Sequence, residues 1–487
     1  MDKAYHARVL PFDSVRRASL LLVVAGLGSC TFDIPDVVPG DGGATQRDTS
    51  DAPVDGVSFR DATADGTTDG PAPTVYNDIT NKANWTIFDT SMVTAGGNVQ
   101  YYSGGTFDGQ HVYLAPTAGS PASSVVLQFD TTAAKGFTDT SSWAHFDTTA
   151  VSTAAGGFWG ATYDGHEFVY LTPFTTAASA TSAADGFLTR YDSSHAFATV
   201  GSWTGFNATS VNMGAQGFSG EAFDGQYIYF APNFAGSATA SGLVARFDTT
   251  SSAWTFFDAL NVNPSAAGFI GAVFDGQYVT FVPNTGTIAL QYDTQPGAFT
   301  ANASWSSFDL STVQGGSTQL AYAGGIYDGT YVYLVPEYYF DGTSYIYGSL
   351  VARYDPKQGF GLGAWTTFDV TNVSPYAHGF AGGAFDGRYV YLVPEANTGT
   401  TMATGAQYVG NGLVVRYDTT QPFGNATSWS TFDLKANFAT TVSGFFGAVF
   451  DGRYLYLVPE GNTNVARFDA RTPPAMPALP FFHGSFF

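Results

Sequence analysis

The sequence contains a single cysteine among its 487 residues. One cysteine cannot supply an internal disulfide framework or the paired cysteines of a zinc or redox motif. Basic residues are also scarce, because 18 lysines and arginines face 40 aspartates and glutamates, which gives a net charge of −22. A chain this negative repels nucleic-acid phosphates, so we expect no DNA or RNA partner.

Charged residues make up only 12% of the chain, about half of the usual share. Aromatic residues reach 16%, and there are 57 glycines. This composition argues against a disordered chain or a coiled coil and favours a β-protein with many tight turns. The length exceeds the usual ~150 residues of one domain, which points to several domains or to a repeat architecture.

The N-terminal region has no hydrophobic run long enough for a membrane-spanning helix, which needs ~20 residues. Its apolar run, Ala18 to Gly28, follows two arginines and fits the central region of a secretory signal peptide. The run ends in Leu27-Gly28-Ser29-Cys30, which resembles the lipobox of bacterial lipoproteins. The resemblance implies cleavage before Cys30, acylation of Cys30, and export to the envelope of a double-membrane bacterium, at its outer membrane. An ordinary signal peptide with a chance cysteine is the alternative.

Three short motifs recur seven times after residue 80. The first is an aromatic-Asp-Gly triplet, with an aromatic residue six positions and a glycine four positions before the aspartate. Successive triplets are 51 to 65 residues apart, and their aspartates are Asp108, Asp164, Asp224, Asp275, Asp328, Asp386 and Asp451. The second motif is an alternating run that ends in an aromatic-Asp pair, as in Leu413–Asp418, and the third begins with tryptophan, as in Asn84–Asp89.

These motifs predict four strands per repeat. Asp-Gly between two strand-like runs is a strong hairpin signal, because both residues tolerate the positive φ of such turns. Four strands repeated seven times predict an all-β, seven-bladed β-propeller with four-stranded antiparallel blades. The glycine-rich strand suits the crowded axis and the tryptophan strand the periphery. Since the chain begins with a tryptophan strand and ends without one, we expect Asn84–Asp89 to complete the last blade and close the ring.

The repeat resembles the kelch and galactose-oxidase class of propellers over about residues 84–469, in its length, its glycine pairs and its Tyr-Asp and Trp elements. The resemblance implies the fold class; no counterpart of a copper site is present. The predicted organisation is therefore a signal peptide (1–29), a disordered tether rich in Asp, Gly, Thr and Pro (30–75), the propeller (76–471) and a tail rich in Pro and Phe (472–487).

We interpret most aspartates as turn caps, because the motif repeats them in every blade. Candidate ligand residues are instead expected on one rim, where the loop after the second strand meets the loop that enters the next blade. They are Glu337, Glu395, Glu460, Asn233, Asn284, Tyr338, Tyr376 and His378. Carboxylates and amides beside aromatic rings suit a glycan ligand or a bound cation; a solvated rim without a ligand is the alternative.

The sequence contains no GxSxG or HExxH motif. We therefore expect a surface-anchored, monomeric lipoprotein whose propeller binds a glycan or protein ligand or acts as a scaffold. We expect no cofactor, with calcium at the rim the one cation considered. The first alternative is an extracytoplasmic glycan hydrolase or lyase that uses rim carboxylates, and the second is a structural envelope protein.

Overall fold

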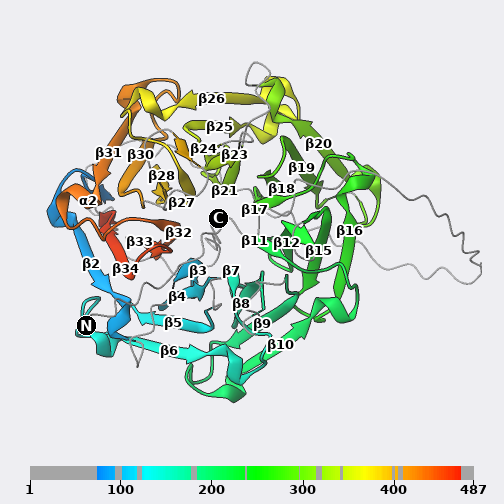
Figure 1. Cartoon of the computed structure of the whole chain (residues 1–487), viewed down its shortest axis with the longest axis horizontal. Helices are drawn as coiled ribbons and strands as arrows, with labels where there is room; N and C mark the ends of the chain where they lie inside the picture. The colour runs from blue at the N-terminus through cyan, green and yellow to red at the C-terminus, as the bar shows by residue number, and fades with distance from the viewer. Residues whose placement is uncertain are drawn as a thin grey trace, which may run out of the picture. The chain divides into compact units, whose positions relative to one another are not determined.

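The computed structural model describes residues 74–93, 101–117, 123–176, 184–235, 239–295, 297–313, 321–340, 344–396, 401–403 and 410–472. Seven four-stranded antiparallel sheets stand around a central axis (Figure 1). This arrangement confirms the predicted all-β seven-bladed propeller. Cys30, the predicted signal peptide and residues 473–487 lie outside the described residues.

The innermost strand of each blade comes from the glycine-containing motif. In order from blade 1 to blade 7, these strands are β3 (Tyr102–Phe107), β7 (Phe158–Tyr163), β11 (Phe218–Phe223), β17 (Phe269–Phe274), β21 (Tyr322–Tyr327), β27 (Phe380–Phe385) and β32 (Phe445–Phe450). The second strands are β4 (His111–Pro116), β8 (Phe168–Pro173), β12 (Tyr227–Pro232), β18 (Tyr278–Pro283), β22 (Val332–Pro336), β28 (Tyr389–Pro394) and β33 (Tyr454–Pro459).

The third and outer strands come from the other two motifs. The third strands are β5 (Val125–Asp130), β9 (Phe187–Asp192), β15 (Leu243–Asp248), β19 (Ile288–Asp293), β25 (Leu350–Tyr354), β30 (Leu413–Asp418) and β34 (Asn464–Asp469). The outer strands are β6 (Trp143–Asp147), β10 (Trp203–Asn207), β16 (Trp254–Asp258), β20 (Trp305–Asp309), β26 (Trp365–Asp369), β31 (Trp429–Asp433) and, for blade 7, β2 (Trp85–Asp89).

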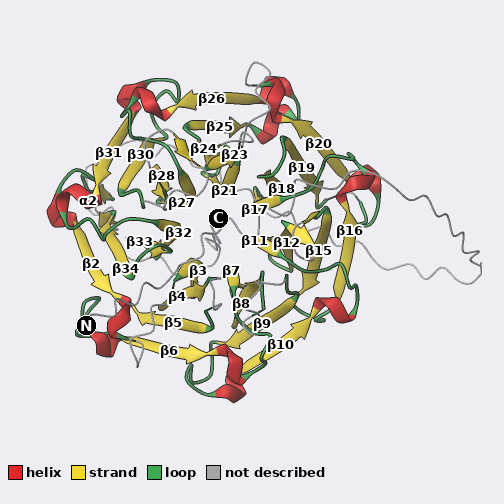
Figure 2. Ribbon diagram, viewed as in Figure 1, coloured by secondary structure: helices red, strands yellow, loops and turns green. Residues whose placement is uncertain are grey.

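Short helices lie at the outer corners of the ring (Figure 2). They are η2 (Lys82–Asn84), η3 (Thr90–Met92), η4 (Thr140–Ser142), η5 (Thr148–Ala150), η6 (Val200–Ser202), η7 (Ala208–Ser210), η8 (Ala259–Asn261), η9 (Asn302–Ser304), η10 (Leu310–Thr312), η11 (Pro356–Gln358), η12 (Leu362–Ala364), η13 (Val370–Asn372), η14 (Ala426–Ser428) and α2 (Leu434–Asn437). Among the described residues, no helix is long and apolar enough to cross a membrane.

The glycine four positions before each hairpin aspartate has a specific backbone role. In every blade the register between the first and second strands shifts around this glycine, as between Tyr102 and Gly105 in blade 1. The glycine itself has a positive φ, for example 74° at Gly104 and 117° at Gly160. Residues with a Cβ rarely adopt this conformation, so the bulge explains why the motif retains glycine there.

The N-terminal strand closes the ring as predicted. Strand β2 pairs antiparallel with β34, from Trp85 opposite Phe468 to Asp89 opposite Asn464, and so forms the outer edge of blade 7. A second pairing joins β1 (Val75–Tyr76) to β35 (Arg471–Thr472). Each of these two strands extends one residue beyond the predicted propeller limits of 76–471. The two ends of the propeller are therefore held together by main-chain hydrogen bonds in two places.

Neighbouring blades are held together by buried apolar clusters, one at each of the seven junctions. At six junctions the outer-strand tryptophan of one blade stacks on the outer-strand phenylalanine of the preceding blade. Ring centroids are 4.3 to 5.6 Å apart in the pairs Trp85–Phe432, Trp143–Phe88, Trp203–Phe146, Trp305–Phe257, Trp365–Phe308 and Trp429–Phe368. Large rings therefore fill the wide outer gap between blades, as the sequence predicts.

The closing strand should contribute more stability than an ordinary edge strand. Trp85 is 4% exposed, and its Nε1 donates a hydrogen bond of 2.9 Å to the carbonyl of Ile79. Trp85→Ala should cost about 3–5 kcal/mol of unfolding free energy, the usual loss for a large buried aromatic residue. Trp254→Ala is the matched control, because Trp254 is only partly buried and stacks within its own blade on Phe256.

Thermal and denaturant unfolding of the full chain would measure both losses. Deletion of residues 84–89 should lower Tm far more than deletion of six residues within 31–70. Equal losses for the two tryptophans, or an unchanged Tm after the 84–89 deletion, would show that the closing strand does not hold the ring.

Candidate functional site

The predicted rim residues all lie on one face of the ring. In each blade the start of the first strand pairs with the proline that ends the second strand, as Phe218 pairs with Pro232. The loop after the second strand and the loop that enters the blade therefore share a face, which we call the rim face. The opposite face, which carries the Asp-Gly turns and the loops after the third strands, is called the hairpin face.

The two amides of the rim link neighbouring blades. Asn233 Nδ2 donates a hydrogen bond of 3.1 Å to the carbonyl of Phe269, and Asn284 Nδ2 donates one of 3.0 Å to the carbonyl of Tyr322. Asn284 Nδ2 also lies 2.5 Å from Glu337 Oε2. Asn284 and Glu337 are 4% and 1% exposed, so the structure brings this predicted pair together in the junction between blades 4 and 5, away from solvent.

The three predicted carboxylates differ in exposure. Glu337 and Glu395 are buried, whereas Glu460 is partly exposed. The backbone N–H group of each glutamate donates a hydrogen bond of 3.0 Å to the carbonyl of the residue directly before the inner strand of the same blade. These acceptors are Ala321, Gly379 and Gly444. The carboxylates thus occupy equivalent places on the rim, but only Glu460 presents its side chain partly to solvent.

The loops of blades 5 and 6 form a small sheet of their own above these residues. It contains β23 (Tyr338–Phe340) and β24 (Ser344–Tyr347) from blade 5, both labelled in Figure 1, and β29 (Thr401–Ala403) from blade 6, in the order β23-β24-β29. All three strands are antiparallel to their neighbours. Main-chain pairing between loops of two blades gives this part of the rim a defined shape.

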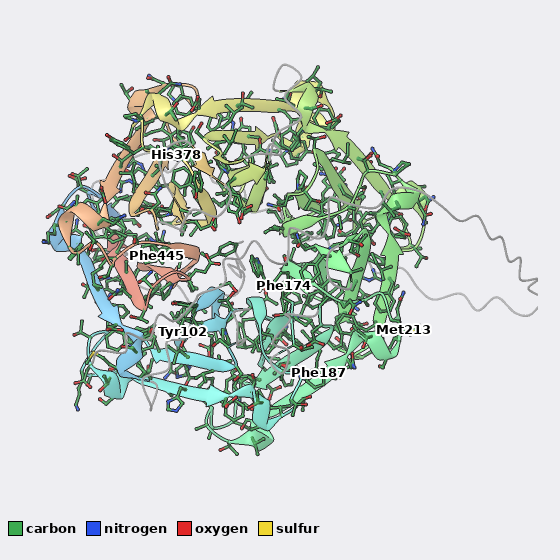
Figure 3. All side chains as sticks on the ribbon, in the orientation of Figure 1. Tyr102, Phe174, Phe187, Met213, His378 and Phe445 are labelled. Carbon is green, nitrogen blue, oxygen red and sulfur yellow. The ribbon has the colours of Figure 1, made fainter. Side chains whose placement is uncertain are left out.

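Aromatic rings from the first two strands of this sheet pack together and against His378. The ring of Tyr347 packs against His378 and Tyr338, with centroids 5.9 Å away in both cases. His378, labelled in Figure 3, is 2% exposed, and its Nδ1 has no hydrogen-bond partner among the described residues. Burial lowers the pKa of His378, so its imidazole is neutral at pH 7. Tyr376 differs from its neighbours, because 67% of it is exposed.

The axis of the propeller is filled by apolar side chains just below the rim. Trp159, Ile270 and Phe446 come from the second position of the inner strands, and Phe174 and Phe234 come from rim loops. Ring centroids are 4.5 Å apart for Trp159–Phe174 and 4.8 Å apart for Phe174–Phe234; Figure 3 shows Phe174 beside the axis. This axial cluster of apolar side chains is buried.

The repeated aspartates cap turns, as the sequence predicts. In blade 1, Asp108 Oδ1 accepts hydrogen bonds from the backbone N–H groups of Gln110 and His111, at 2.8 and 2.6 Å. Its Oδ2 accepts a bond of 2.6 Å from the hydroxyl of Tyr113. Only the glycine of each Asp-Gly turn has a positive φ, so the aspartate contributes its side-chain oxygens. Among the described residues no group of three His, Cys, Asp or Glu side chains is arranged to hold a metal.

Glu221 is a buried acidic residue that the repeat motifs do not indicate. Glu221 lies in the inner strand β11 and is 0% exposed. Its Oε2 accepts a hydrogen bond from Thr172 of blade 2, and its Oε1 has no partner among the described residues. The other six inner strands have Gly or Ala at this position, and the other six second strands have Ala or Val at the position of Thr172. This paired departure from the repeat is the feature of the sequence from which the contact between Glu221 and Thr172 could be predicted.

Glu221 should make stability depend on pH. Burial raises its pKa from 4.5 to about 8, so the folded protein keeps the carboxyl protonated where the unfolded chain has lost the proton. This contribution is fully present below pH 4.5 and is lost as pH rises to about 8, at no more than about 1.4 kcal/mol per pH unit. In Glu221→Gln the decrease should disappear.

Denaturant titrations at pH 5 and pH 8 would measure this difference. Glu167→Gln is the control, because Glu167 lies in the hairpin turn of the adjacent blade and its carboxylate accepts an exposed hydrogen bond from Ser194. Parallel pH profiles for the wild-type protein and Glu221→Gln would contradict the assignment.

Solved structures show similarity at low identity. YCF48 bound to a D1 peptide is 13% identical, covering 79% of this chain and 96% of that chain with a TM-score of 0.44. YCF48 from Cyanidioschyzon merolae is 12% identical over 79% and 98% of the two chains, with a TM-score of 0.45. PorZ, an essential surface component of the type-IX secretion system of Porphyromonas gingivalis, is 10% identical over 81% of this chain and 39% of that chain, with a TM-score of 0.44. No family model and no curated protein matches the sequence.

Proposed function

We propose that the protein is an exported lipoprotein whose propeller binds a glycan or protein ligand on the rim face over blades 5 and 6. The observation that carries this proposal is the β23-β24-β29 sheet, in which loops from two blades pair with each other. Recognition residues are commonly placed on such loops, because a rigid scaffold holds them in position. By contrast, β13 (Phe234–Ala235) and β14 (Thr239–Ala240) of blade 3 form a two-stranded sheet that includes no other strand of the described residues.

The chemistry of this region suits binding through rings and hydrogen bonds. Tyr376 presents most of its ring to solvent, and Tyr338 is partly exposed. Tyrosine combines a large apolar face with a hydroxyl group, so it stacks on sugar rings or apolar side chains and also forms hydrogen bonds. Glu460 adds a partly exposed carboxylate on the neighbouring blade.

We favour a binding function over a catalytic function that would use the rim carboxylates. Glu337 and Glu395 are buried, and Glu337 accepts a hydrogen bond from Asn284. A glycosidase needs two carboxyl groups that flank the scissile bond of its substrate. Carboxylates enclosed in blade junctions would have to be uncovered before they could take that position.

Tyr376 provides the direct test of the rim. Tyr376→Ala should weaken ligand binding at least tenfold, because the exposed ring is lost, and should leave Tm within a degree of the wild-type value. Met213→Ala is the matched control, since Met213 is 86% exposed in the corresponding loop that enters blade 3. Full-length protein on glycan and peptide arrays, with and without calcium, would identify the ligand class.

Binding that is equal for wild type, Tyr376→Ala and Met213→Ala would overturn the placement of the site. Activity on an array glycan, seen as cleavage products by mass spectrometry, would favour the glycan hydrolase or lyase instead. Ligand binding that occurs only in the presence of calcium would assign a calcium ion to the rim.

The lipid anchor has an independent test. The Leu27–Cys30 motif predicts that Cys30 carries the lipid after export. Cys30→Ser should abolish acylation by mass spectrometry and move the protein from the membrane fraction to the soluble fraction. A Ser29→Ala control keeps a small residue before the cysteine and should remain acylated. Membrane retention of Cys30→Ser would contradict the anchor.

A further inference from the structure

Arginines of the third strands lie between two aromatic rings in several blade junctions. One ring belongs to a tyrosine of the same blade, and the other to a phenylalanine in the loop of the next blade. The guanidinium carbon lies 4.1 to 4.4 Å from each ring centroid in the sets Tyr227–Arg246–Phe299, Tyr331–Arg353–Phe423 and Tyr454–Arg467–Phe137. The repeat therefore contains a preformed guanidinium site that the chain's own arginine fills.

Blade 4 has the two rings but lacks the arginine. Tyr278 and Phe360 occupy the equivalent ring positions, and Gln291 replaces the arginine. A cavity of about 190 Å³ opens here, lined by Tyr278, Gln291, Asp293, Ser304, Tyr354 and Phe360 among others. We call this cavity the blade 4 slot. It lies on the hairpin face, between blades 4 and 5.

A second substitution removes further volume from the same junction. Five blades have a tyrosine five positions after the hairpin aspartate, and its hydroxyl donates to that aspartate at 2.6 to 2.8 Å. Blade 4 has Thr280 at that position, and Asp275 Oδ2 has no hydrogen-bond partner among the described residues. Gln291 Nε2 instead donates hydrogen bonds of 3.2 Å to Thr280 Oγ1 and to the hydroxyl of Tyr354, so the smaller side chains of Gln291 and Thr280 take the place of the arginine and tyrosine of other blades.

The charges around the slot are negative. Burial raises the pKa of Asp275, and the charge of Asp293 contributes in the same direction. In blades 6 and 7 the residue equivalent to Asp293 pairs with an arginine at 2.7 and 2.8 Å. In blade 4 its side-chain neighbour is the neutral Gln277, whose Nε2 is 3.4 Å from Asp293 Oδ1. A cation in the slot would meet the Asp293 carboxylate in addition to the rings.

Blade 1 shows that loss of the arginine alone does not create the slot. Gln128 replaces the arginine there, but Tyr113 is retained. Gln128 Nε2 donates a hydrogen bond of 3.1 Å to the Tyr113 hydroxyl, and the Tyr113 ring packs against Tyr191 and Phe197 of blade 2. The ring fills the junction that stands open in blade 4.

We propose that the blade 4 slot binds a guanidinium group supplied by a ligand, with Tyr278 and Phe360 on its two faces and Asp293 as its acceptor. A guanidinium fits better than an ammonium group, because it is planar, stacks on aromatic rings and is more weakly hydrated. The net charge of −22 also favours the approach of a cationic ligand. This site lies on the opposite face from the proposed rim site and does not depend on it.

Titration calorimetry on the full chain would test the slot with agmatine, with a capped Gly-Gly-Arg-Gly-Gly peptide, and with the lysine counterpart of that peptide. We expect saturable binding of the arginine peptide, at least tenfold tighter than the lysine peptide. Equal or tighter binding of agmatine would identify a small guanidinium compound as the source, and tighter binding of the peptide would identify an arginine side chain of a protein.

Gln291→Arg is the decisive variant, because it supplies the side chain that other blades use to fill the site. It should abolish guanidinium binding and raise Tm. Gln128→Arg is the matched control in blade 1 and should leave binding unchanged. If Gln291→Arg fails to fold, Tyr278→Ala, at a partly exposed position, should weaken binding at least tenfold. Absence of saturable binding at millimolar ligand, equal affinity for lysine and arginine peptides, or binding retained in folded Gln291→Arg would overturn the proposal.

Discussion

The stacking of each outer-strand tryptophan on the phenylalanine of the preceding blade is the contact on which the ring depends. Blades meet closely at the axis, where the inner strands have glycine and small residues, and diverge towards the periphery, where only large rings span the gap. The closing strand takes part in two of these stacks, because Trp85 packs on Phe432 and Phe88 packs under Trp143. One N-terminal strand therefore completes both the last blade and its two junctions.

Much of this architecture could be predicted because each structural motif occurs seven times in the sequence. Local requirements explain the glycine of the bulge, the Asp-Gly turn and the tryptophan strand. Each requires a positive φ or a ring that fills a gap, so the same residue types recur in every blade. The strand pairing between residues 85–89 and 464–469 followed from the phase of the repeat alone. The hydrogen bonds of the turn aspartates could be predicted only in part. Their bonds to backbone N–H groups are typical of Asp-Gly turns, but their bond to a tyrosine hydroxyl is visible only in three dimensions.

The candidate site was less predictable, because burial at a blade junction depends on two blades at once. Glu337 and Glu395 follow a proline at a strand end, a position that looks exposed in sequence, yet both are buried, and Glu337 accepts a hydrogen bond from Asn284 of the preceding blade. Sequence alone also gave no sign that residues 401–403 pair with β24, because that pairing joins two loops rather than two repeats. Glu221 was predictable in principle: it replaces a small residue found in all other blades, and Thr172 changes with it across the junction.

Departures from the repeat thus carry more information about function than the repeat itself. In the junction of blades 2 and 3, which lacks the tryptophan–phenylalanine stack, the guanidinium carbon of Arg190 lies 4.8 Å from the centroid of the Phe206 ring. In the junction of blades 4 and 5 the arginine and the tyrosine are both replaced by smaller residues. Gln291 bonds to Thr280 and Tyr354 there, but a cavity beside Asp293 remains open. The hairpin face carries two aspartates per blade, one in the turn and one at the end of the third strand, so an unfilled cation position there lies in a strongly negative field. Selection for stability alone would favour refilling that position with arginine, since the same chain does so elsewhere; an open slot is therefore best explained by a cation that comes from outside the chain.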